Sequence, residues 1–131
     1  MIAIDTNIIV RLLTKDDPKQ YASSRKLFNN SEIYIPDTVI LETEWVLRFA
    51  YDFEPSEICS AFRKLFGLPN VKLSNQFIIA QAIDWHEKGL DFADAFHLAL
   101  SQQVSTLKTF DEKFIKKSQN LSACSVQMPP R

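Results

Sequence analysis

The sequence contains few residues of several types, and each shortage excludes a class of protein. Only two of the 131 residues are glycine and no tract is compositionally biased, which excludes a collagen-like or low-complexity chain. The two cysteines, Cys59 and Cys124, stand far apart and without a Cys-x-x-Cys spacing. This spacing indicates neither a disulfide framework nor a zinc site, so we expect both cysteines to be reduced.

An excess of positive charge is also missing. Fifteen basic and 16 acidic residues give a formal net charge of -1, so any nucleic-acid role must rest on a local patch or on metal. The apolar N-terminus is interrupted by Asp5 and Arg11, which argues against a signal peptide or a membrane span. We therefore expect one soluble, cytoplasmic domain over residues 1–131, long enough to bury a core.

The N-terminal segment MIAIDTNIIVRLL predicts a buried strand, a polar hinge and a helix. A short Ile-rich run is typical of the central strand of a parallel sheet that is covered on both faces. Asp5 would then lie at the carboxyl end of the strand, where α/β sheets bind ligands. The alternative is that Asp5 or Thr6 only caps the following helix.

Short strands and helices alternate along the rest of the chain, which predicts an α/β sandwich with a mostly parallel sheet of about four to five strands. Asp37 is the expected cap of the third helix. We expect further strands over residues 33–35, 71–73, 105–110 and 123–127. We expect helices over residues 18–30, 37–51, 55–67, 76–88 and 91–103, and a short basic helix after residue 111.

Two glutamates of the third predicted helix are given different roles by the helical period. Glu42 shares its face with apolar residues such as Trp45 and Phe49, where a buried carboxylate costs several kcal/mol unless it is paired. Glu44 has Arg48 four residues on, as in a solvated helix. We therefore take Glu42 as the functional residue, the alternative being an edge of the stripe open to water.

Asp91 and Asp94 begin the predicted helix DFADAFHLAL. Their spacing resembles a capping box, which would explain both residues without a function. Small alanines in the same segment would let the helix pack closely against a neighbour. We expect Asp91 to cap the helix and Asp94 to carry function.

Asp111 follows a predicted strand, as Asp5 does, so a parallel sheet would bring both to one edge. Asp5, Glu42, Asp94 and Asp111 could then converge. Four carboxylates repel one another unless divalent cations are present, and an oxygen-only ligand set suits Mg²⁺ or Mn²⁺. Such ions promote phosphodiester hydrolysis by activating water and stabilising the leaving oxygen.

Other polar residues are candidates for supporting roles. Thr6 and Asn7 could hydrogen-bond the acids, and Thr109 is a weaker candidate for the same role. We expect His86 and His97 to be structural, and the tryptophans and phenylalanines to be mostly core, with none identifiable as a base-stacking residue. The candidates for phosphate contacts are Arg11, Lys15, Arg48, Lys108 and Lys113.

Nearly the whole sequence resembles the PIN-domain VapC toxins of type II toxin–antitoxin systems. The segments that carry the resemblance are IDTNIIVRLLTKDDP, VILETEWVLRFAY, DFADAFHLAL and TFDEKF. The resemblance implies a three-layer α/β/α sandwich and Mg²⁺-dependent endoribonuclease activity. It also implies a homodimer inhibited by a VapB-like antitoxin.

The resemblance further implies that the metal ligands are Asp5, Glu42, Asp94 and Asp111, supported by Asn7 and Thr109. Asp91 occupies a less strict position of the family pattern, so its role stays open. Two other functions remain: an RNA-processing PIN nuclease outside a toxin pair, and a noncatalytic binding module. An aspartyl-phosphate phosphatase is disfavoured because Asn7 replaces the second aspartate that such enzymes carry.

Overall fold

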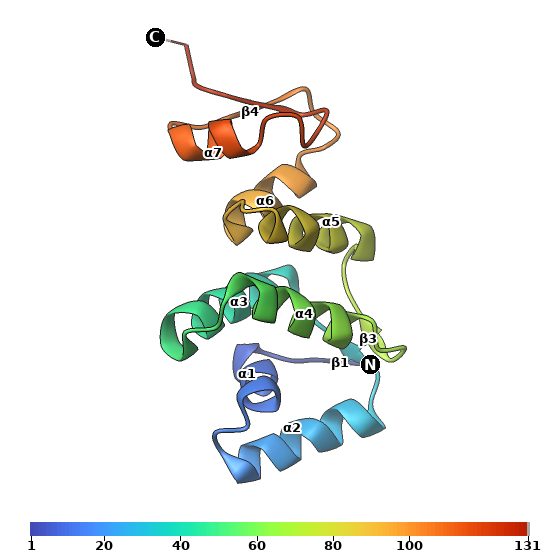
Figure 1. Ribbon diagram of the computed structural model, residues 1–131. Helices are drawn as coiled ribbons and strands as arrows, with labels where there is room; N and C mark the ends of the chain where they lie inside the picture. The colour runs from blue at the N-terminus through green and yellow to red at the C-terminus, as the bar shows by residue number, and fades with distance from the viewer. Residues whose placement is uncertain (131) are drawn as a thin grey trace. The chain divides into compact units, whose positions relative to one another are not determined.

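The computed structural model describes residues 1–130 and shows seven helices and five short strands in that range (Figure 1). The strands are β1 (Ile2–Ala3), β2 (Ile33–Tyr34), β3 (Val71–Lys72), β4 (Thr106–Lys108) and β5 (Ser125–Gln127). The helices are α1 (Thr6–Thr14), α2 (Pro18–Asn30), α3 (Asp37–Tyr51), α4 (Pro55–Phe66), α5 (Gln76–Glu87), α6 (Phe92–Leu100) and α7 (Glu112–Lys117). The predicted alternation of strands and helices is confirmed.

The chain divides into two compact units, residues 1–76 and residues 77–131. In the first unit, parallel pairing joins three strands in the order β1-β2-β3. Helix α1 packs against α2 and α3, and α3 packs against α4. The buried side chains include Ile9, Val10, Ile33, Ile35, Ile40, Leu47, Ile58 and Phe62.

The prediction that the first strand is central was wrong for this sheet. Strand β2 is central and β1 lies at the edge, with both of its residues exposed. The buried residue of the apolar run is Ile4, which follows the strand and is 6% exposed. The run therefore contributes to the core through the residue that leads into α1.

Helix starts in the first unit follow local chemistry. The Asp17 side chain accepts hydrogen bonds from two backbone N–H groups of α2, and Pro18 takes the first helical position, as expected. Asp37, however, is the first residue of α3 and not its cap, because Pro36 occupies the cap position. The Asp37 carboxylate instead accepts a hydrogen bond from the Ser74 hydroxyl, at 2.5 Å.

The second unit contains α5, α6 and α7 and the parallel pair β4-β5. Gly89, in the turn that follows α5, has a φ of 113°, and the Leu90 N–H donates to the Trp85 carbonyl at 3.1 Å. Helix α6 ends at Leu100, three residues earlier than expected. The buried side chains here include Ile79, Trp85, Phe92, Phe96, Leu98 and Phe114.

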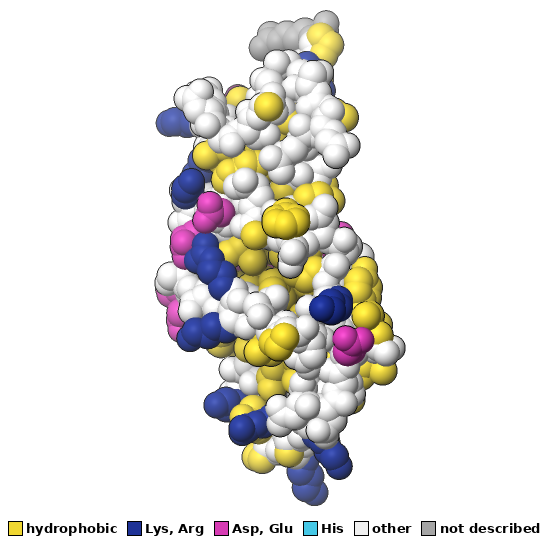
Figure 2. Space-filling view, turned by 90° about the vertical axis from the view of Figure 1, so that its right-hand side faces the viewer, with side chains coloured by type: hydrophobic (Ala, Val, Ile, Leu, Met, Phe, Trp, Pro, Cys, Tyr) yellow, Lys and Arg dark blue, Asp and Glu magenta, His cyan; other side chains and the backbone are white. Residues whose placement is uncertain are grey.

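Hydrophobic side chains also reach the surface, where they lie among charged ones (Figure 2). None of the helices in residues 1–130 combines the length and apolar character needed to cross a membrane.

Candidate active site

A small pocket in the first unit lies where β1 leads into α1. It has a volume of about 200 Å³ and is lined by Asp5, Thr6, Asn7, Glu42 and Val46. Asp5 stands at the N-cap position of α1 with an extended backbone, but its side chain makes no capping hydrogen bond. The capping alternative therefore does not account for the Asp5 carboxylate, which is exposed at the pocket.

The two sides of this pocket are joined by a hydrogen bond. The buried Thr6 hydroxyl, at the start of α1, donates to Oε1 of Glu42 on α3. The two residues are 36 positions apart in the sequence. Thr6 therefore orients a carboxylate at the pocket, and Val46, one turn after Glu42, completes the lining.

The structure reverses the expected environments of the two glutamates on α3. Glu44 is buried, at 2% exposure, and Glu42 is exposed. The Glu44 carboxylate accepts hydrogen bonds from Arg48 at 2.7 and 3.2 Å, so the expected pair forms in a buried position. Trp45 and Phe49, on the same face as Glu42, are exposed as well, because the helix turns a different face to the core.

The second unit brings three aspartates near one another. The Asp91 carboxylate caps α6 by accepting from the Asp94 N–H at 3.2 Å, as expected. The Asp111 carboxylate caps α7, and the backbone N–H of Asp111 donates to the Thr109 hydroxyl at 3.0 Å. Burial raises the pKa of Asp94, and the negative charges of Asp91 and Asp111 raise it further.

These acids form two sets, one in each unit. Asp5 and Glu42 belong to residues 1–76, and Asp94 and Asp111 belong to residues 77–131. Within residues 1–130, no group of three or more His, Cys, Asp or Glu side chains is arranged to hold a metal ion. Each set alone offers carboxylate oxygens, the donors that suit Mg²⁺ or Mn²⁺. A cation near Asp94 would also neutralise the negative charges of Asp91 and Asp111 that act on it.

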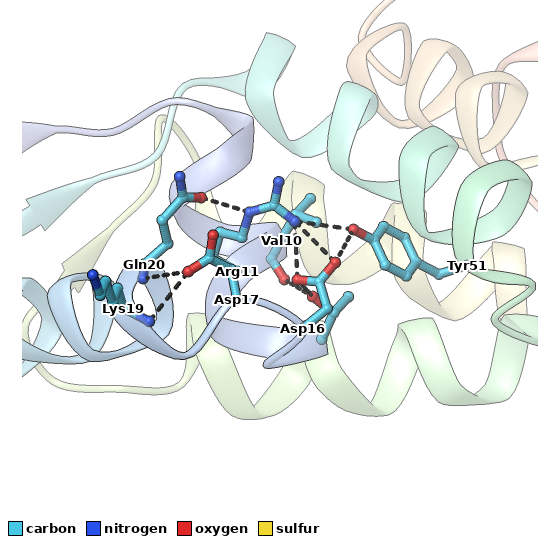
Figure 3. A network of polar contacts seen from close by, with 8 residues as sticks. Val10, Arg11, Asp16, Asp17, Lys19, Gln20 and Tyr51 are labelled. Carbon is cyan, nitrogen blue, oxygen red and sulfur yellow. Dashed lines mark hydrogen bonds and ion pairs between the residues drawn. The ribbon is translucent and has the colours of Figure 1, made fainter.

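Arg11 belongs to a polar network at the end of α1 (Figure 3). Its Nη1 lies 2.9 and 3.0 Å from the Asp16 carboxylate oxygens and 3.1 Å from the Tyr51 hydroxyl, while its Nε donates to Gln20 at 2.7 Å. Tyr51 donates to Asp16 at 2.7 Å. These bonds lower the pKa of Asp16 to about 2, chiefly through the Tyr51 hydroxyl.

The other basic candidates lie in different settings. Arg48 is paired with Glu44, and the Lys15 ammonium lies 5.3 Å from the centre of the Tyr21 ring. Lys108 donates to the Gln127 side chain at 2.9 Å. Lys113 is exposed on α7.

The two histidines differ in burial. His86 is buried, and its Nδ1–H donates to the Leu90 carbonyl at 2.7 Å across the turn after α5. His97 is exposed on α6. The structural role expected for His86 agrees with this contact.

A larger cavity, of about 660 Å³, lies elsewhere in the first unit. Its lining contains two charged side chains, Glu57 and Lys64, among apolar and hydroxyl groups. It therefore lacks the paired carboxylates of the smaller pocket, and cavity size does not indicate the chemistry here.

A family model described as PIN domain matches residues 2–120, which include both sets of acids. The chain belongs to the PIN domain family. PIN domains form a superfamily of nucleases, so this membership supports a hydrolase that acts on nucleic acids, usually with divalent metal ions. The parallel strands and numerous helices agree with the PIN-like α/β/α fold. No curated protein matches the sequence.

Proposed function

We propose that this PIN domain is a divalent-metal-dependent endoribonuclease whose two units act as one domain. The observation that carries the proposal is the pocket at Asp5, in which a buried threonine orients Glu42. Family membership supplies the nuclease class. We assign Asp5 and Asp94 to the principal metal, with Glu42 and Asp111 completing the ligand set.

The proposed ion is Mg²⁺, with Mn²⁺ as a substitute. When bound, such an ion lowers the pKa of an attacking water and stabilises the leaving oxygen of a phosphodiester. The Thr6 hydroxyl holds Glu42 in its orientation, and Asn7 offers a side-chain amide at the same pocket. Thr109 fixes the backbone at Asp111, and Asp91 anchors the start of the helix that carries Asp94.

The test is cleavage of total cellular RNA by purified protein with Mg²⁺ or Mn²⁺, against a chelator control. Asp5→Asn and Asp94→Asn should each lower the cleavage rate by more than about 100-fold, because losing a ligand costs more than losing its hydrogen-bond partner. Thr6→Val should lower the rate by about 10- to 100-fold. Glu32→Gln, an exposed acid outside the pocket, is the matched control and should cleave normally.

Several outcomes would contradict this assignment. Full cleavage by folded Asp5→Asn protein would remove the pocket from the active site. Metal-dependent cleavage that survives Asp94→Asn at the wild-type rate would show that Asp94 is not a ligand of the catalytic metal. The absence of both cleavage and any metal-induced thermal shift would instead favour a noncatalytic binding module.

We further propose that the enzyme is the toxin of a VapBC-type pair, acts in the cytoplasm as a homodimer and is inhibited by a VapB-like antitoxin. This rests on the resemblance of the four sequence segments to VapC toxins. A small antitoxin gene should lie directly upstream. Expression of the wild-type chain should arrest growth, co-expression of that gene should relieve the arrest, and Asp94→Asn should cause none. If no such gene exists, an RNA-processing PIN nuclease is the better assignment.

A further inference from the structure

Helix α3 exposes two aromatic side chains close together. Trp45 and Phe49 are 56% and 58% exposed, and their ring centroids lie 5.0 Å apart with planes inclined at 48°. They are four residues apart, so they project from the same face of the helix. Large aromatic side chains carry a free-energy penalty in water, and a contiguous exposed pair is typical of a binding surface.

This aromatic pair adjoins the pocket at Asp5. Glu42 and Val46 line that pocket, and Trp45 and Phe49 each lie three residues after one of them. The four residues therefore form one stripe along the exposed side of α3. The opposite side of the helix is buried through Ile40, Thr43, Glu44 and Leu47.

The Phe49 ring is held in place from within the helix. The central carbon of the Arg48 guanidinium lies 4.4 Å from the ring centroid, and Arg48 is itself fixed to buried Glu44 at 2.7 Å. A ring that is already immobilised loses little side-chain entropy when a ligand stacks on it. The Phe49 ring is therefore preorganised, and the Trp45 ring, inclined to it at 48°, offers a second exposed face beside the acidic pocket.

We propose that Trp45 and Phe49 stack unpaired bases of single-stranded RNA next to the phosphate that is cleaved. The proposal rests on the ribonuclease function proposed above, and it assigns substrate-binding residues to that site. Specific recognition of RNA commonly uses single-stranded bases stacked on aromatic side chains. Because the net charge of -1 provides no general attraction for phosphates, stacking would supply binding energy that electrostatics does not.

A second copy of this chain fits the same surface less well. A symmetric dimer across this stripe would place the patch against its own copy, including the Glu42 carboxylate. Two like charges would then lose water without gaining a partner, which is costly. A base stacked on the rings leaves Glu42 free to face the pocket.

The test measures binding separately from cleavage. All proteins carry Asp5→Asn, which prevents turnover. Binding is measured as the fluorescence anisotropy of a labelled single-stranded RNA of about 12 nucleotides, a length within the range of single-strand binding sites. Trp45→Ala and Phe49→Ala should each weaken binding about ten-fold, the loss expected for one stacked base. An abasic oligomer of the same length should bind weakly and equally to all variants. Leu68→Ala, an exposed apolar residue outside the pocket, should change nothing.

Tryptophan fluorescence gives an independent readout. The chain has two tryptophans, and Trp85 is only 3% exposed, so quenching by RNA should come from Trp45. Trp45→Phe should keep most of the RNA affinity because it retains a ring, whereas Trp45→Leu should lose it. Circular dichroism and thermal melting establish that each variant is folded.

Three results would overturn the stacking proposal. The first is unchanged RNA binding in both alanine variants. The second is an equal loss of binding by these variants when the oligomer is abasic. The third is a change in the oligomeric state of Trp45→Ala that is reversed in Trp45→Leu. Cleavage by the wild-type chain, measured in parallel, separates this proposal from the one on which it rests. Base-dependent binding without cleavage would refute the proposed nuclease activity and support the stacking surface. Cleavage without base-dependent binding would support the nuclease activity and refute the stacking surface.

Discussion

Removing Arg48 should destabilise the protein because it leaves the buried Glu44 carboxylate without its cation. The Glu44 side chain is 3% exposed and the Arg48 side chain 33% exposed, and two hydrogen bonds of 2.7 and 3.2 Å join them. We expect Arg48→Met to preserve the helix and much of the aliphatic packing while it removes both donors. The carboxylate must then bind water, take a proton or stay unpaired.

The magnitude follows from the burial of each partner. Breaking a fully buried ion pair by deleting one side costs about 3–5 kcal/mol. Because a third of Arg48 is open to solvent, water can enter after its removal, so we expect a loss of about 2–3 kcal/mol. For a chain of this size, that loss lowers the melting temperature by about 10 °C.

Urea denaturation followed by far-UV circular dichroism measures the effect, with Arg25→Met on α2 as the matched control. Arg25 is exposed, so its substitution should stay within about 0.5 kcal/mol of wild type. The double variant Arg48→Met/Glu44→Leu should recover most of the loss, because no unpaired charge remains. A loss in Arg48→Met no larger than that in Arg25→Met would refute the reasoning.

Three further predictions concern single side chains. In chelator, Asp94→Asn should raise the melting temperature at pH 7, because the raised pKa of Asp94 means that its charged form destabilises the fold. The gain should vanish well below the usual pKa of 3.8, where the carboxyl is protonated in the folded and unfolded states. No gain at pH 7 would contradict this prediction. Tyr51→Phe should lower the melting temperature above pH 4. The difference from wild type should shrink as the pH falls through about 2, because Asp16 becomes protonated over that range; a constant difference would contradict the role of Asp16. Among residues 1–130 the buried Thr43 hydroxyl has no hydrogen-bond partner, so Thr43→Val should stabilise by about 1 kcal/mol in urea denaturation, and destabilisation would contradict this expectation.

Local chemistry made much of the fold predictable. Asp17 before Pro18 specified the start of α2, Gly89 the end of α5, and Asp91 the cap of α6. Each of these signals acts over four residues or fewer, so it is visible in the sequence without knowledge of packing. The parallel pairing also followed from the alternation of strands and helices.

The orientation of α3 was not predictable in the same way. The helix has apolar residues on two sides, with Leu47 on one and Trp45 and Phe49 on the other, so its periodicity does not select the buried face. The core took the face with Ile40 and Leu47, which placed Glu44 inside. The i,i+4 spacing of Glu44 and Arg48 is compatible with a buried or an exposed pair, so it could not show which face of α3 is buried.

These environments change the physical case for a metal ion. Glu42 was expected to be desolvated, but it is exposed and held by the Thr6 hydroxyl, so burial gives no reason for a cation there. The electrostatic reason for a cation lies instead at Asp94, whose pKa is raised by burial and by two neighbouring carboxylates. A cation bound there would relieve the repulsion that Asp94 experiences from Asp91 and Asp111. At the pocket beside Asp5, the hydrogen bond from Thr6 already fixes the orientation of the Glu42 carboxylate.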